Sequence, residues 1–222
     1  MRTIAVIARK GGSGKTTVAT HLALAAHLRG LRTLIADTDP QRSSLEVLKA
    51  RRDDGPERLG ATGAELFGIQ VSAMRADVEA MVIDTAAGAE DELAHAIVLA
   101  DLSLLVLRPT FLDMAAAIQT AEVVRRLRKP AMIVVSQAPT ARGGVEPPQV
   151  RKALQALRLM RLPVVPTIIR ARAAYQSALE SGRSVEELAG DPAASQEIAE
   201  LWDFIERFAF TGAAARPSVA NG

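Results

Sequence analysis

Short, continuous runs of apolar residues alternate along the chain with longer segments of helical length. The runs have the length of buried strands and lie at Thr3–Ala8, Thr33–Ala36, Met81–Ile83, Leu102–Leu107, Ala131–Val135 and Val164–Ile169. The longer segments predict helices at Thr16–Arg29, Ser44–Arg52, Asp91–Leu99, Met114–Arg128, Pro148–Met160, Tyr175–Glu180 and Pro192–Phe210. Runs that are apolar at every position indicate strands buried on both faces. The order therefore predicts an α/β fold with a doubly wound, mainly parallel sheet flanked by helices.

Length and composition fit one domain. The chain has 222 residues, of which 49% are hydrophobic, which is enough for a single core. We expect one domain over residues 1–210 and a disordered tail over 211–222, because the tail is small and polar and contains Pro and Gly. The longest uncharged stretch, Thr16–Leu28, is shorter than the roughly 18 apolar residues of a membrane span. The absence of cysteine excludes disulfides and iron–sulfur ligation and favours a cytoplasmic location.

Charge is unevenly distributed, although the formal net charge is only +2. From Arg125 to Arg172 there are eleven Lys and Arg residues and one acid, Glu146, whereas residues 173–222 include three basic and eight acidic residues. A basic block of this density favours a polyanionic partner.

The stretch KGGSGKTT, residues 10–17, follows the first predicted strand and opens the first predicted helix. Glycines in this position let backbone N–H groups surround phosphate oxygens, and the helix N-terminus adds a favourable dipole. Lys15 would reach the β and γ phosphates, Thr16 would offer its hydroxyl to Mg²⁺, and Thr17 would bind a more inward phosphate. The strict G-x-x-x-x-G-K-[ST] pattern is not met, because Arg9 occupies its first glycine.

This loop resembles the deviant Walker A motif of the ParA/MinD class of P-loop ATPases. The resemblance implies binding of ATP or ADP with Mg²⁺. It also implies that Lys10 reaches across an ATP-dependent homodimer to the partner's phosphates, while Lys15 serves its own nucleotide. The nucleotide-binding residues implied for the loop are Lys10, Gly11, Gly12, Ser13, Gly14, Lys15, Thr16 and Thr17.

Two acidic stretches are similar to further motifs of the class. In LIADTDPQ, Asp37 and Asp39 are two residues apart and would share one face of an extended chain. The resemblance implies that Asp39 orients or activates the attacking water and that Asp37 lies on the magnesium side. The catalytic residues that it implies are Asp39, Lys10 and Lys15. MVIDTAAG is similar to a Walker B strand, which implies that Asp84 holds magnesium through water.

The resemblance extends more loosely to the segment 166–185, which implies that Pro166 and Arg170 lie near the base and ribose. The sequence also departs from the class. Ala86 and Ala87 replace common prolines, Arg42 stands where glycine is frequent, and Ser136 stands where an adenine-reading asparagine is often found.

The chain begins at its first predicted strand and is most similar to short ParA-type ATPases. That resemblance implies non-specific DNA binding, nucleoid association of the ATP-bound dimer, and a ParB-like or other cargo-adaptor protein that stimulates hydrolysis. The basic block supplies DNA-binding candidates, namely Arg151, Lys152, Arg158, Arg161, Arg170 and Arg172, with Arg125, Arg126, Arg128 and Lys129 as a second set.

Two alternatives remain open at this point. A MinD-like membrane-cycling ATPase needs a basic amphipathic C-terminal helix, but the last predicted helix is acidic on its polar positions, so no stable membrane association is expected. A metabolic enzyme of the same fold needs a substrate pocket that the sequence does not identify.

Overall fold

A six-stranded parallel sheet runs through the computed structural model, which describes residues 1–88 and 90–210. Its strand order is β3-β2-β4-β1-β5-β6. The strands are β1 (Arg2–Ile7), β2 (Thr33–Asp37), β3 (Glu57–Gly60), β4 (Ala80–Asp84), β5 (Leu102–Leu107) and β6 (Ala131–Val135). Every residue of β2, β4, β5 and β6 is buried, as the continuous apolar runs predict.

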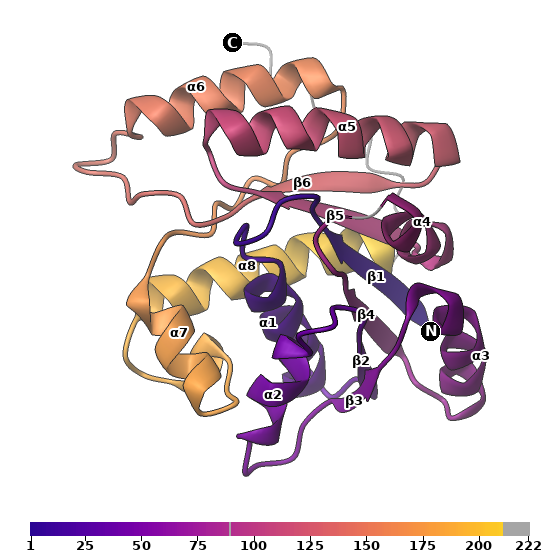
Figure 1. Cartoon of the computed structure of the whole chain (residues 1–222). Helices are drawn as coiled ribbons and strands as arrows, with labels where there is room; N and C mark the ends of the chain where they lie inside the picture. The colour runs from indigo at the N-terminus through magenta and orange to yellow at the C-terminus, as the bar shows by residue number, and fades with distance from the viewer. Residues whose placement is uncertain (89, 211–222) are drawn as a thin grey trace.

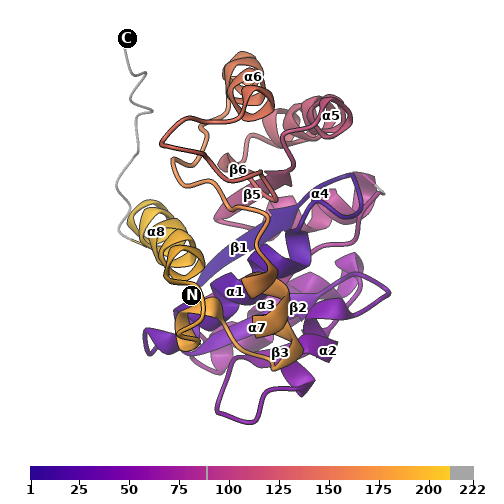
Figure 2. The ribbon, with the colours of Figure 1, turned by 90° about the vertical axis from the view of Figure 1, so that its left-hand side faces the viewer.

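Helices cover both faces of this sheet (Figure 1, Figure 2). One face packs against α1 (Lys15–Leu28), α7 (Ala173–Glu180) and α8 (Pro192–Ala209), with Leu48 of α2 (Ser43–Lys49) joining the same core. The other face packs against α3 (Leu66–Arg75), α4 (Glu90–Leu99), α5 (Phe111–Leu127) and α6 (Pro148–Leu157). Short 3₁₀ turns lie at η1 (Gly63–Glu65), η2 (Arg158–Met160) and η3 (Val185–Glu187). The prediction of a doubly wound α/β fold is confirmed.

The prediction of a strand at Val164–Ile169 is wrong. This segment runs beside β6 and exchanges backbone hydrogen bonds with Ile133 and Val135, but it forms only isolated bridges, at Val164 and Arg170. Pro166 lies in its middle and has no N–H to donate to a ladder. The segment therefore lines the sheet edge without joining it.

The sequence analysis did not predict two elements of the fold, β3 and α3. The edge strand β3 reads ERLG, and all of its residues are exposed, so it lacks the apolar run that would predict a strand. Helix α3 also has no counterpart among the predicted helices. The expected disordered tail, 211–222, lies outside the described residues. Among the helices of residues 1–88 and 90–210, none has the length and hydropathy that a membrane crossing requires.

Parallel pairing brings the carboxyl ends of three strands to one edge. In the register of β1 with β4, Val6 lies opposite Asp84, and in the register of β2 with β4, Asp37 lies opposite the same residue. The loop that follows β1 therefore lies beside two carboxylates from neighbouring strands, as is usual for sites in open α/β sheets.

Candidate functional site

The loop between β1 and α1 depends on two glycines with positive φ. Gly12 has a φ of 71° and Gly14 a φ of 93°, in the left-handed region that other residues rarely adopt. A Cβ on Gly14 would also lie 2.6 Å from the hydroxyl oxygen of Ser136, which follows β6. The amide of Gln137 donates to the carbonyl of Gly12 over 3.0 Å. The loop is thus closely packed against the end of β6.

Two polar side chains of the loop, Lys15 and Ser13, are buried. Lys15 is 7% exposed and makes no ion pair among the described residues. Burial lowers the pKa of Lys15, and the negative charges of Asp84 and Asp39 oppose this shift. The Ser13 hydroxyl is buried and lacks a hydrogen-bond partner within the described chain. Together with the free N–H groups at the start of α1, these groups form a site for an anion.

Asp84 has the properties of a cation ligand. It is fully buried, and neither carboxylate oxygen accepts a hydrogen bond of good geometry from the described residues. Burial and the neighbouring Asp37 raise the pKa of Asp84 to about 7, against the weaker opposing effects of the Thr16 hydroxyl and the Lys15 ammonium. An unsatisfied buried carboxylate beside a hydroxyl fits Mg²⁺, which usually takes one or two protein ligands and keeps several waters. No cluster of three or more His, Cys or acidic residues that could hold a metal is present in residues 1–88 and 90–210.

Asp37 is occupied by hydrogen bonds from its own loop. One carboxylate oxygen accepts from the hydroxyl and backbone N–H of Ser44, over 2.7 and 3.1 Å, and the other accepts from the backbone N–H of Asp39 over 2.9 Å. Asp37 thus fixes the turn that carries Asp39, which is partly exposed. Its contribution at the cation position is its charge next to Asp84.

Arg42 stabilises the same turn and was not singled out as a site residue. It has a φ of 52°, a backbone conformation that glycine adopts readily. Its guanidinium donates to the backbone carbonyls of Asp37 and Ala61, so it bridges the ends of β2 and β3.

Lys10 lies on the outer side of the loop, in an ion pair within its own chain. Its ammonium is 2.8 Å from a carboxylate oxygen of Asp113 in the first turn of α5. Arg108 binds the same carboxylate through two side-chain bonds, of 2.7 and 3.1 Å. Burial alone would raise the pKa of Asp113, but the hydrogen bonds from Arg108 and Lys10 hold it at about 2.

The contact between Lys10 and Asp113 could not be read from the sequence, because more than a hundred positions separate the two residues. One local signal was available. Thr110 and Asp113 have the spacing of a helix N-cap and its third residue, and the Thr110 side chain does accept from the Asp113 N–H. That signal identifies the start of α5 but not the residue that Asp113 binds.

A cavity of about 280 Å³ adjoins the loop on the side of α7. Its lining includes Thr17, Ser136, Gln137 and Arg170, so it has room for a base or a ribose. Arg170 lines this cavity, and its position near a base and ribose stays a prediction. Pro166 does not line this cavity; it lies exposed in the segment beside β6.

The basic candidates fall into two groups. Arg151, Lys152, Arg158 and Arg161 are exposed on α6 or directly after it, and α6 lies beside α5, whose C-terminal end carries the second basic set (Figure 1). By contrast, Arg170 is bonded to Glu146 and to the Pro139 carbonyl, and Arg172 is bonded to Glu197. In this conformation, the guanidiniums of Arg170 and Arg172 are not available to bind DNA.

The fold and the loop define a P-loop nucleotide-binding protein. More particularly, the chain belongs to the CobQ/CobB/MinD/ParA nucleotide-binding domain family, whose model matches residues 4–185. It is 28% identical over 214 residues to the maintenance of carboxysome distribution protein A of Halothiobacillus neapolitanus, covering 90% of this chain and 94% of that protein.

Two solved structures show the same fold. A Cyanothece McdA variant in complex with ATP superposes with a TM-score of 0.75 at 18% identity, over 92% of this chain and 96% of the other. The septum site-determining protein MinD of Pyrococcus horikoshii, complexed with Mg-ADP, superposes with a TM-score of 0.74 at 17% identity, over 96% and 99% of the two chains.

Proposed function

We propose that this protein is a ParA-like ATPase that forms an ATP-dependent sandwich dimer, binds DNA without sequence preference, and positions DNA or another cargo together with a partner protein. The observation that carries this proposal is the placement of two lysines on one loop. Lys15 is buried on the inner side, whereas Lys10 lies on the outer side, 35% exposed at its side chain and held by Asp113. A single nucleotide needs only Lys15, so Lys10 is available for the nucleotide of a neighbouring subunit.

In the proposed nucleotide complex, the loop N–H groups and Lys15 bind the phosphates, and Thr17 binds a more inward phosphate. Thr16 and Asp84 would hold Mg²⁺, and Asp37 would add negative charge on the same side. When bound, the metal neutralises charge that develops on the phosphates. Asp39 lies on a turn held by its neighbours, and there it orients the attacking water.

Dimerisation frees Lys10 from its own chain. In the proposed dimer the Lys10 ammonium leaves Asp113 for the γ phosphate bound by the other subunit, and Arg108 remains as the partner of the buried Asp113 carboxylate. Because ADP lacks the γ phosphate, it offers less charge to attract Lys10. The dimer therefore depends on ATP.

The DNA-binding surface is proposed at α6 and the end of α5, where exposed cations gather. The name of the Halothiobacillus relative supports a role in positioning over one in metabolism. Such a protein would be cytoplasmic, and nucleoid-associated when ATP-bound.

The test is binding to a random-sequence duplex at two salt concentrations, without nucleotide, with ADP and with ATP. Replacing both Arg151 and Arg158 by Ala should weaken ATP-dependent binding and reduce the salt slope by about 2, because two phosphate contacts are lost. Replacing Arg58 and Arg75 by Ala removes the same charge from exposed positions on β3 and α3, where β3 forms the opposite edge of the sheet from β6, and serves as the control. Equal losses in both double variants, or binding that ignores ATP, would contradict the proposal.

A further inference from the structure

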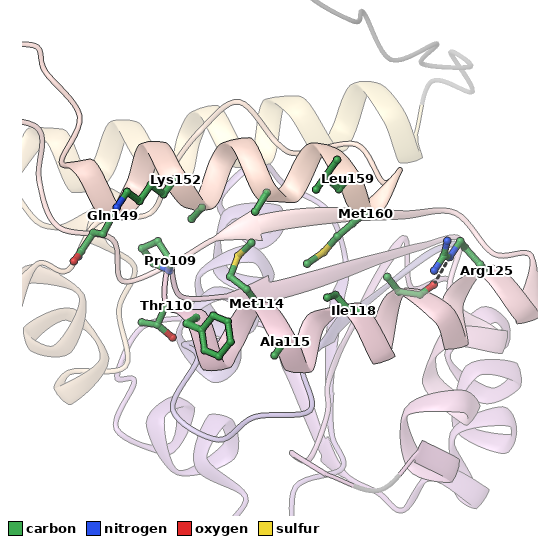
Figure 3. Close-up of a pocket in the computed structure, with 14 residues that line it drawn as sticks. Pro109, Thr110, Met114, Ala115, Ile118, Arg125, Gln149, Lys152, Leu159 and Met160 are labelled. Atoms are coloured by element: carbon green, nitrogen blue, oxygen red, sulfur yellow. Dashed lines mark hydrogen bonds between the residues drawn. The ribbon is translucent and has the colours of Figure 1, made fainter.

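An apolar groove of about 730 Å³ lies between α5 and α6, apart from the nucleotide site (Figure 3). Phe111, Met114 and Ile118 line it from α5, and Leu159 and Met160 line it from the turn that follows α6. Figure 3 shows the side chains of Met114 and Met160 in the space between the two helices. From Phe111 to Arg125 the groove follows α5 for about 21 Å, which is the length of four helical turns.

The protein's own core explains only part of this apolar lining: Met160 is buried in the core and Met114 packs against it, but the other large apolar side chains are exposed. Helix α5 has one buried stripe, which includes Ala117, Ala121 and Val124 and faces the sheet. Phe111, Met114 and Ile118 form a second stripe at helical spacing, in which Phe111 is 84% and Ile118 49% exposed. Leu159, across the groove, is 82% exposed. A helix with a second, exposed apolar stripe is typical of an interaction surface.

The charges around the groove favour an acidic occupant. Within the described chain no acidic side chain lines it, whereas Arg125 and Lys152 do, near its two ends (Figure 3). A DNA duplex could satisfy these cations but has no apolar face to fill the groove. A membrane surface is flat and does not fill a recess, whereas an amphipathic helix inserts a row of apolar side chains into such a groove.

We propose that the α5–α6 groove binds an amphipathic helix of a partner protein, in which acidic side chains flank an apolar stripe. The groove begins at Thr110 and Phe111, within one turn of Asp113, which holds Lys10. An occupant that shifts the start of α5 therefore changes the contact between Asp113 and Lys10. This coupling to hydrolysis rests on the proposed function, whereas binding of the helix does not.

The experiment selects ligands from a display library of random peptides of about 16 residues, the length that spans four helical turns, on the full chain without nucleotide. Enriched peptides are expected to carry apolar residues at helical spacing with flanking Asp and Glu. Their affinity for Ile118→Ser should fall about tenfold or more. Val98→Ser is the matched control, because Val98 is also a β-branched helical residue, 51% exposed, and lies outside the groove.

Two further arms use the same pair of variants, and serine keeps their charge unchanged. One arm measures binding to a DNA duplex of about 30 base pairs, and the other measures binding to vesicles of phosphatidylcholine and phosphatidylglycerol. Selected peptides that bind Ile118→Ser as tightly as wild type, or that lack acidic and apolar patterning, overturn the proposal. A loss of duplex or vesicle binding specific to Ile118→Ser, with no peptide enriched, assigns the groove to DNA or lipid and also overturns it.

Addition of a selected peptide to wild-type protein turning over ATP then tests the coupling. The coupling is supported if the peptide changes the hydrolysis rate of wild type but not that of Ile118→Ser. An unchanged rate overturns the coupling but leaves the docking site standing. If wild type hydrolyses no ATP at all, the proposed function fails, while the peptide binding measured without nucleotide is unaffected.

Discussion

Replacing Asp84 by Asn should stabilise the protein without nucleotide and make its stability less dependent on pH. Asp84 is fully buried and accepts no hydrogen bond of good geometry within the described residues, and its pKa rises from 3.8 to about 7. A raised carboxyl pKa means that the folded state binds a proton that the unfolded state has already released. Stability is therefore lost as the pH rises from about 4 to about 7. Asparagine keeps the shape and removes this titration.

The magnitude follows from the shift. A change of about 3 pKa units is worth about 4 kcal/mol when fully developed, and between pH 5 and pH 8 the wild type should lose about 2 to 3 kcal/mol that Asp84→Asn retains. The assay is urea unfolding of both proteins at the two pH values, without Mg²⁺ or nucleotide. If the difference in unfolding free energy between the two proteins is the same at both pH values, the pKa of Asp84 is not raised by its burial. The same substitution should abolish Mg²⁺-dependent ATP hydrolysis.

Other substitutions test other parts of the site. Gly14→Ala should lower the unfolding free energy by about 1 to 3 kcal/mol and weaken nucleotide binding, because the added Cβ would meet Ser136. Gly11→Ala is the control and should fold normally, because a Cβ at Gly11 would enter open space. Equal melting temperatures of the two variants would refute this reasoning. Asp39→Ala should bind ATP and dimerise but not turn over, so normal turnover would remove Asp39 from its role. Asp113→Asn should cost about 2 kcal/mol at neutral pH, because the pKa of Asp113 is lowered from 3.8 to about 2. That difference should shrink as the pH falls from about 4 toward 2, where the wild-type carboxyl protonates, and a constant difference in urea unfolding would argue against the ion pair.

The sequence was sufficient to predict the central strands and the glycine-rich loop between β1 and α1, because their signals are local. β5 and β6 are buried at every position, and such runs predict parallel strands without knowledge of the rest of the fold. The glycines of the loop lie directly between a strand and a helix. Edge strand β3 gave no such signal, because it is exposed on both faces and its side chains need not be apolar.

Contacts between distant segments could not be predicted from local patterns. The sequence suggests that the basic block forms one surface. In the structure, however, Arg172 pairs with Glu197 of α8, which belongs to the acidic part of the chain. In the same way, Lys10 is recognisable as a second loop lysine, but its contact with Asp113 depends on where α5 begins. Ion pairs of this kind follow from the fold.

The central claim is that Lys10 serves the nucleotide of a second subunit. Its most direct test is the molar mass in solution with ADP and with ATP and Mg²⁺, on Asp39→Ala to prevent turnover, with and without Lys10→Ala. Arg9→Ala removes the same charge from the neighbouring loop position and serves as the control. We predict an ATP-dependent dimer that Lys10→Ala abolishes and Arg9→Ala retains, while a labelled ATP analogue still binds the Lys10→Ala monomer. A Lys10→Ala protein that dimerises with ATP as the parent does would contradict the account.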